Sequence, residues 1–165
     1  MKAYLQLLII GGMILFTSCQ KGISSSLEDD NVSGNGMQAV SARITGGDWK
    51  FTTAWIKYSD GEIDSSFEDE CKWDDLYKYE SNGDATFMHG ALPCGIDPAD
   101  GKFANWELLK DGTELKEVYT RDMWSETEGS VVEYKVEFIS NHKLTLSRIL
   151  IEPGKSFIQY STYTK

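Results

Sequence analysis

The chain has 165 residues, with 16 basic and 26 acidic side chains and a formal net charge of −10 at pH 7. This acidic balance argues against nucleic acids and against electrostatic binding to anionic lipid, because both partners need a basic protein face. The length suffices for one domain with its own core, but not comfortably for two.

The N-terminus has the layout of a secretory signal. Lys2 precedes an apolar run from Ala3 to Phe16, and small residues follow it before Cys19. A run of about 14 residues is shorter than the roughly 18–20 that span a bilayer, so we expect residues 1–18 to be removed as a signal peptide. Removal takes away one charge, that of Lys2, and leaves a mature chain near −11.

The segment Leu15-Phe16-Thr17-Ser18-Cys19 resembles the lipobox of bacterial lipoproteins, with Phe16 at a place where Leu is usual. The resemblance implies that Cys19 is lipidated and that this lipid holds the chain in the membrane. We therefore expect a location in the cell envelope of a Gram-negative bacterium, at the outer membrane. The alternative is an ordinary secreted protein in which Cys19 is free or paired.

Residues 19–43 are expected to form a disordered tether after the lipidated cysteine. The segment is rich in Ser, Gly and Asp and has few bulky apolar residues, so it cannot bury enough surface to offset the entropy of ordering. Its acidic run, Glu28-Asp29-Asp30, is a second candidate feature, as a sorting signal for surface display. The folded domain is then expected over residues 44–165.

From Ile44 onward apolar and polar residues alternate with period two, as in half-buried strands. The pattern predicts about eight strands, and turn residues such as Asn82-Gly83 separate several of them as hairpin connections. Only Met123 to Glu128 could form a helical turn. The predicted strands are at 48–58, 76–80, 85–89, 105–109, 114–121, 132–138, 144–150 and 156–163.

Eight short strands in a meander predict an all-β fold, an eight-stranded antiparallel up-and-down β-barrel, whose closure removes exposed sheet edges. Small barrels of this kind either pack solid or hold one small ligand. The aromatic residues that the period-two alternation places on the inward face could therefore either fill the core or line a ligand cavity. These candidate ligand-binding residues are Trp49, Phe51, Trp55, Tyr77, Tyr79, Phe87, Trp106, Tyr134 and Phe138.

Two further cysteines, Cys71 and Cys94, form an even pair if Cys19 carries lipid. In an oxidising envelope compartment such a pair favours a disulfide. The alternative is a reactive or metal-binding thiol pair, but no histidine lies at the spacing of a zinc site.

No motif in the chain indicates catalysis, a metal or a cofactor. The Gly-x-Ser-x-Gly signature of hydrolases is absent, and His89 and His142 fit solvated surface positions. The acidic residues 68–70 with Asp74 and Asp75 lack the ligand spacing of a calcium loop. We therefore expect a protein that is not an enzyme, with no bound metal and no cofactor.

Several short motifs, in this order, resemble those of lipocalin-like domains in bacterial lipoproteins. They are a G-x-W at the first strand (Gly47-Asp48-Trp49), a C-x-x-D-D segment (Cys71-Lys72-Trp73-Asp74-Asp75), the turn Asn82-Gly83, Cys94, and a stretched second G-x-W from Gly101 to Trp106. The resemblance covers about residues 44–152. It implies an eight-stranded barrel, a disulfide between Cys71 and Cys94, and a late-strand arginine packed across the first tryptophan. Arg148 is the candidate to cover Trp49. The resemblance names no ligand.

The expected function is that of a monomeric, lipid-anchored envelope protein that binds a small apolar or amphipathic ligand without catalysis. The alternative is a structural or adhesive module that binds a protein or a glycan through its outer face.

Overall fold

The structure, a computed structural model, describes residues 36–65, 70–92, 94–95, 98–153 and 155–165. The expected signal peptide, Cys19 and the tether up to residue 35 lie outside these residues. Within the described residues, no helix is both long enough and apolar enough to cross a bilayer.

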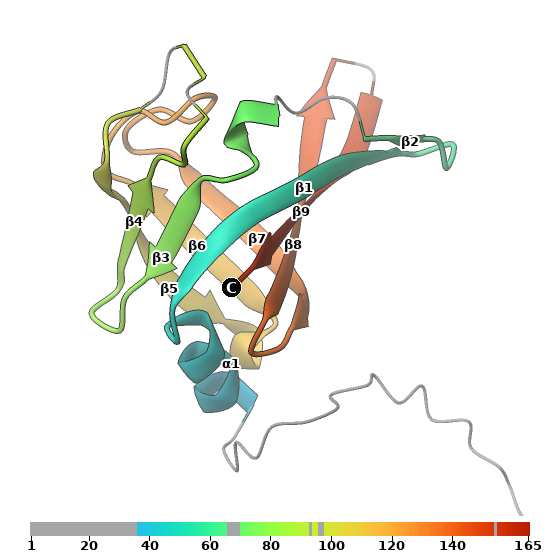
Figure 1. The fold of residues 1–165 in the computed structure, drawn as a ribbon. Coiled ribbons are helices and arrows are strands. Elements are labelled where there is room, and N and C mark those ends of the chain that lie inside the picture. Colours follow the sequence, from blue (N-terminus) through green and yellow to red (C-terminus); the bar gives the residue numbers. More distant parts are fainter. Residues whose placement is uncertain (1–35, 66–69, 93, 96–97, 154) are drawn as a thin grey trace, which may run out of the picture.

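One antiparallel sheet forms a closed barrel, which confirms the predicted fold (Figure 1). Each of the eight barrel strands pairs with the next barrel strand along the chain, and the first, β1, also pairs with the last, β9, from Lys50 opposite Thr164 to Tyr58 opposite Phe157. The eight barrel strands are β1 (Asp48–Tyr58), β3 (Leu76–Tyr79), β4 (Asp84–Met88), β5 (Gly101–Leu109), β6 (Glu114–Tyr119), β7 (Val131–Ile139), β8 (Lys143–Glu152) and β9 (Lys155–Thr164). A two-residue strand, β2 (Ile63–Asp64), adds a short pairing to β1.

A helix, α1 (Gly36–Ile44), occupies the last residues of the expected tether and corrects that prediction for residues 36–43. Its buried Ile44 joins the barrel core, and Val40 packs against the same core. Val40 also lies against the short helix η2 (Lys110–Gly112), where a Cβ at Gly112 would be only 3.1 Å from the Val40 Cβ. The polar composition of residues 36–43 did not predict this helix. A nine-residue helix needs only a few apolar side chains, such as those of Val40 and Ile44, to pack against the end of the barrel.

Lys165, and not Arg148, covers Trp49 at the end of the barrel that α1 closes. The Trp49 indole nitrogen donates to the Ile44 carbonyl at 2.7 Å, and Lys165 Nζ lies 4.2 Å from the indole ring. Lys165 also donates to the Arg43 carbonyl at 2.9 Å. The predicted Trp49–Arg148 pair is wrong because Arg148 lies four residues, or roughly 13 Å, along β8 from Leu144, which is nearer to the closed end.

Two β-bulges turn predicted inward residues outward. The register of β1 shifts between Phe51 and Thr53, and that of β7 shifts between Val136 and Phe138. Each extra residue reverses the parity of the strand beyond it. Trp55 therefore lies on the outer face, stacked on Tyr160 with the ring centroids 3.8 Å apart, and Phe138 is 38% exposed.

The segment from Met123 to Glu128 is a tight turn and not the helical turn expected from sequence. Met123 and Glu126 exchange backbone hydrogen bonds of 2.8 and 2.6 Å. Trp124, between them, has a φ of 36°, which is rarely adopted by a non-glycine residue. This turn lies at the end of the barrel opposite α1.

Candidate functional site

A partly enclosed cavity of about 120 Å³ lies inside the barrel and extends to the Met123–Glu126 turn, at the end opposite α1. Most of the strands contribute inward-facing side chains to it. Its lining is formed by Phe51, Lys72, Tyr77, Tyr79, Phe103, Glu117, Tyr119, Met123, Trp124, Ser125, Glu126, Tyr134, Arg148, Gln159, Ser161 and Tyr163. Aromatic rings and a few polar groups therefore converge on one small space.

Four of the nine aromatic residues predicted from parity line this cavity, and the other five do not. The four are Phe51, Tyr77, Tyr79 and Tyr134. Trp49, Phe87 and Trp106 lie in or against the core beside it, and the bulges place Trp55 and Phe138 outside the barrel.

Glu117 is a buried acid in the cavity lining, on the inward face of β6 and only 2% exposed. Its carboxylate accepts hydrogen bonds from the hydroxyls of Tyr79 at 2.8 Å and Tyr119 at 3.1 Å. The Tyr134 side chain lines the same cavity from β7. Burial raises the pKa of Glu117 above the ordinary carboxyl value, although these hydrogen bonds and nearby Arg148 act in the opposite direction.

The tyrosines around Glu117 remain neutral hydrogen-bonding groups. Burial raises the pKa of Tyr77, Tyr79 and Tyr134 well above the ordinary value for tyrosine. Tyr77 also forms an aromatic wall with two other rings of the lining: its centroid is 5.4 Å from that of Tyr163 and 6.0 Å from that of Phe103. The cavity thus combines an apolar wall with hydroxyl groups at defined places.

Arg148 enters the cavity from β8 and is already paired. Its Nε donates to Gln159 Oε1 at 2.7 Å, and one terminal nitrogen donates to Glu126 Oε1 at 2.7 Å. The Glu126 ion pair ties the Met123–Glu126 turn to the barrel wall, with both side chains mostly buried. The turn is thereby held across the open end of the cavity.

Trp124 and Lys72 lie at the rim of the cavity. Lys72 Nζ is 5.6 Å from the Trp124 ring, and this ring also contacts Phe87 at 5.0 Å between centroids. Trp124 is partly exposed, so the rim carries a large aromatic surface that faces both solvent and cavity.

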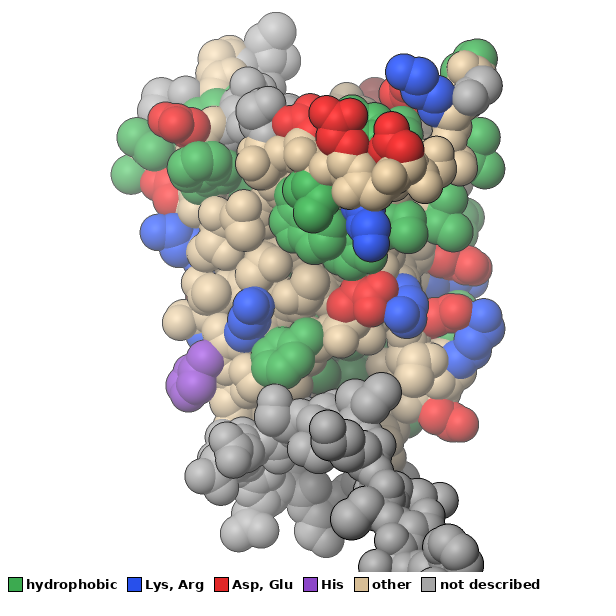
Figure 2. Space-filling model, turned by 90° about the vertical axis from the view of Figure 1, so that its right-hand side faces the viewer, with side chains coloured by type: hydrophobic (Ala, Val, Ile, Leu, Met, Phe, Trp, Pro, Cys, Tyr) green, Lys and Arg blue, Asp and Glu red, His purple; other side chains and the backbone are tan. Residues whose placement is uncertain are grey.

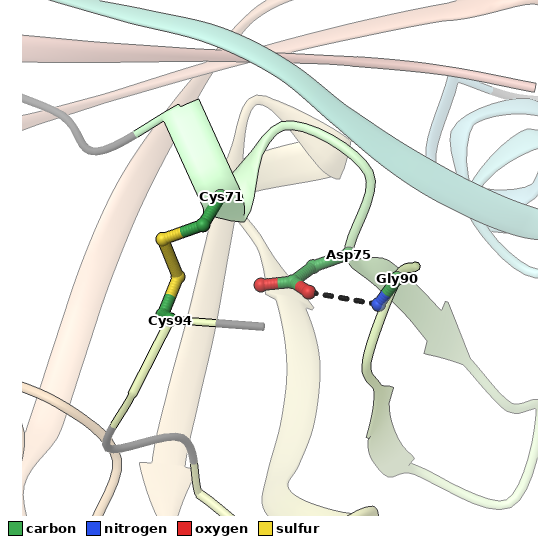
Figure 3. Close-up of a disulfide and its surroundings, with 4 residues drawn as sticks. All are labelled: Cys71, Asp75, Gly90 and Cys94. Carbon is green, nitrogen blue, oxygen red and sulfur yellow. Dashed lines mark hydrogen bonds between the residues drawn. A yellow bond between two sulfur atoms is a disulfide. The ribbon is translucent and has the colours of Figure 1, made fainter. Parts of the chain in front are cut away.

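The predicted disulfide is confirmed and lies beside this rim. Cys71 and Cys94 are bonded, with 5.3 Å between their Cα atoms, and Cys71 belongs to the short helix η1 (Glu70–Lys72) that also carries Lys72 (Figure 3). The alternative of a reactive or metal-binding thiol pair is therefore excluded in this structure. The disulfide links η1 to the loop that follows β4.

The acidic pair Asp74-Asp75 has a structural role in the same region. Asp75, buried, accepts a hydrogen bond from the Gly90 amide at 3.0 Å (Figure 3), and Asp74 accepts one from the Ala91 amide at 2.6 Å. A Cβ at Gly90 would lie 2.1 Å from the Asp74 carboxylate, so this contact requires glycine. Disulfide and carboxylates together fix the residues before β3 against those after β4.

Two larger hollows lie on the outside of the barrel, one of about 580 Å³ near β2 and one of about 290 Å³ beside β3 and β4. Both are open and are lined largely by exposed or half-buried residues of neighbouring segments. We place the candidate site in the smaller interior cavity because buried polar groups converge only there among these three spaces. Ligand sites typically combine a concave apolar wall with a few oriented polar groups.

The outer face of β8 and β9 carries exposed apolar side chains. Ile149 and Ile151 are 70% and 83% exposed, and Ile158 lies opposite Ile149 on β9. Figure 2, which views the face on the right of Figure 1, shows hydrophobic side chains gathered among charged ones. The patch is part of a mixed surface, and none of the residues that the structure describes covers Ile149 or Ile151.

Sequence reasoning missed several cavity residues, above all Glu117, Tyr119 and Tyr163. A signal was present for the first two, since Leu115, Glu117 and Tyr119 share one parity in the predicted strand 114–121. An acid among inward apolar residues is the pattern that indicates a buried polar site. The place of Arg148 in an apolar strand correctly marks it as unusual, but its partners are Glu126 and Gln159 and not the predicted Trp49.

The histidines lie outside the cavity lining. His89 Nδ1 lies 2.6 Å from Asp100 Oδ1, and this contact together with the His89 amide lowers the pKa of the Asp100 carboxyl. Within the described part of the chain there is no group of three or more His, Cys, Asp or Glu side chains arranged to hold a metal ion.

No protein-family model matches the chain, and no curated protein matches it. Among solved structures, the chain is similar to a lipocalin-like protein from Bacteroides uniformis. The two are 19% identical, the match covers 74% of this chain and 98% of the other, and the TM-score is 0.44. This likeness concerns the fold alone, which the strand order of the barrel establishes by itself.

Proposed function

We propose that this barrel is a non-catalytic module that binds one small molecule in the cavity around Glu117. The observation that carries the proposal is the joining of an aromatic wall with buried hydrogen-bonding groups in a partly open space. A barrel with a solid core and no ligand would be more stable with apolar side chains at these positions, because each buried polar group costs desolvation free energy.

The size and lining of the cavity narrow the expected ligand to a small amphipathic molecule. An empty engineered cavity of about 150 Å³ takes up benzene, so a space of about 120 Å³ accommodates a ligand of similar size or one end of a longer ligand. The hydroxyls and the carboxyl of Glu117 would orient its polar group. An amphipathic ligand therefore fits this lining better than a purely apolar one.

The direct test of this function is native mass spectrometry of the full chain purified from its own host. We expect a small molecule that is retained under gentle conditions and released on unfolding. A chain that carries no adduct, and that gains none from extracts of the host, would contradict the proposal.

Anchoring through Cys19 is part of the proposed function and is supported by the sequence of the first 19 residues. Two or more acyl chains anchor a protein stably, whereas one chain anchors it only marginally. We expect the natural chain in the membrane fraction and a Cys19→Ser variant in the soluble fraction. A mature chain that starts at another residue and is wholly soluble would contradict the anchor.

A further inference from the structure

We propose that the ligand is a small organic cation, an amine with a compact apolar or aromatic group, whose ammonium pairs with Glu117. The inference rests on the proposed function and deepens it by naming the class of ligand. It is drawn from the charges, the rings and the volume of the cavity.

Glu117 forms no ion pair with a described residue, although two cations also line the cavity, Arg148 nearby and Lys72 over the Trp124 ring at the rim. Arg148 is neutralised by Glu126 at 2.7 Å and is further held by Gln159. Among the described residues, the hydrogen-bond partners of Glu117 are the neutral hydroxyls of tyrosines. A cationic ligand would therefore supply the charge that Glu117 lacks, and a charge-assisted hydrogen bond is stronger than a neutral one.

The rings of the cavity favour a cation as well. Phe51, Tyr77 and Phe103 line the space, and Tyr163 lies within 5.4–5.5 Å of two of them. The negative face of an aromatic ring attracts an ammonium group, and this attraction grows when water is excluded. Such rings also provide a dispersion surface for the apolar part of the ligand.

An anionic ligand would meet opposite conditions. The guanidinium of Arg148, which would bind a carboxylate, already has hydrogen bonds to Glu126 and Gln159. An anion bound to the remaining guanidinium N–H groups would share the charge of Arg148 with Glu126, and it would lie in the same small space as Glu117. The cavity geometry therefore ranks a cation above a neutral isostere and a neutral isostere above an anion.

The experiment titrates the full chain with three molecules of nearly equal shape: benzylamine, benzyl alcohol and benzoate. At pH 7 they are a cation, a neutral molecule and an anion. By isothermal titration calorimetry we expect benzylamine to bind at least about tenfold more tightly than benzyl alcohol, with benzoate weakest. This ranking uses the natural chain and needs no variant.

The Glu117→Gln variant tests the assigned partner. It keeps the shape of the side chain and removes its charge, so the preference for benzylamine over benzyl alcohol is expected to disappear. The matched control is Glu107→Gln, which changes an exposed acid paired with Lys116 on the outside of the barrel. This control is expected to keep the full preference.

The outcomes separate the inference from the proposed function. Equal binding of benzylamine and benzyl alcohol, or tighter binding of benzoate, overturns the cationic ligand and leaves a ligand-binding cavity. An unchanged preference in a folded Glu117→Gln variant overturns the role of Glu117. Absence of binding by all three molecules, in a chain that also retains no molecule from its host, overturns both.

Discussion

The two ends of this barrel are built from the same strands and differ in how their interior is filled. At the end closed by α1, the core side chains are mostly apolar. The indole N–H of Trp49 there donates a hydrogen bond to the backbone carbonyl of Ile44. At the open end, Glu117 and several tyrosines surround a space that the protein does not fill. The comparison shows that packing stabilises one end, whereas the other end retains polar groups at a cost in stability.

The largest effect is expected at the closed end, from Trp49→Ala. Trp49 is fully buried, and truncating a buried Trp or Phe to Ala typically costs about 3–5 kcal/mol of unfolding free energy. Denaturant unfolding measures this loss. Trp55→Ala, which removes an indole from the outer face, serves as the control and should cost clearly less. Equal losses in the two variants would contradict the assignment of the closed end as the packed one.

The next effect concerns the rim of the open end, where Cys71 and Cys94 are bonded. Replacing both by serine should lower the free energy of unfolding by about 3 kcal/mol, because the unfolded chain loses a constraint. Ligand affinity should fall as well, since η1 carries both Cys71 and the rim residue Lys72. A double variant with unchanged stability would show that the disulfide does not constrain this end.

The third prediction uses the buried acid of the open end. Because burial raises the pKa of Glu117 in the folded state, the folded chain holds this proton more tightly than the unfolded chain. The free energy of unfolding should therefore fall as pH rises from the ordinary carboxyl pKa through the raised one. For one group the slope is at most about 1.4 kcal/mol per pH unit.

Glu117→Gln should remove this component of the pH dependence, and Glu107→Gln should leave it in place. Urea unfolding at a series of pH values measures the difference between the variants. A curve for Glu117→Gln that runs parallel to that of the natural chain would contradict the raised pKa.

The smallest effect is expected from Lys165→Met, which removes the cation above Trp49 and its bond to the Arg43 carbonyl. A partly exposed cation over an indole contributes about 0.5–1 kcal/mol. Thermal and denaturant unfolding should show a loss of this size, and Lys155→Met, at the exposed first residue of β9, should show none. A larger loss for Lys155→Met would reverse this assignment.

The barrel itself could be predicted from the sequence because strands, turns and closure depend on local alternation and short hairpins. Asn82-Gly83 and the alternation of Val132 to Val136 were sufficient signals for their elements. The bulges could not be predicted, since each depends on the register with a neighbouring strand. They alone account for the wrong side assigned to Trp55 and Phe138.

The site was predicted less completely than the fold. The alternation of residues predicts Tyr77 and Tyr79 as inward-facing, and the same alternation in strand 114–121 also places Glu117 inward, although Glu117 is not aromatic. The partners of Arg148 could not be found from sequence, because Glu126 lies in a turn whose position depends on the whole barrel. The cation above Trp49 came from the last residue of the chain, which no motif indicates.

We expect a small ligand to bind at the open end of the barrel and at no other face. The chain can be labelled with ¹³C in its tyrosine rings and titrated with benzylamine while NMR spectra are recorded. We predict that the resonances of the cavity residues Tyr77, Tyr79 and Tyr119 shift with added ligand, and that those of Tyr160 on the outer face stay unchanged. Shifts confined to Tyr160, or no shift at any cavity tyrosine, would contradict the account.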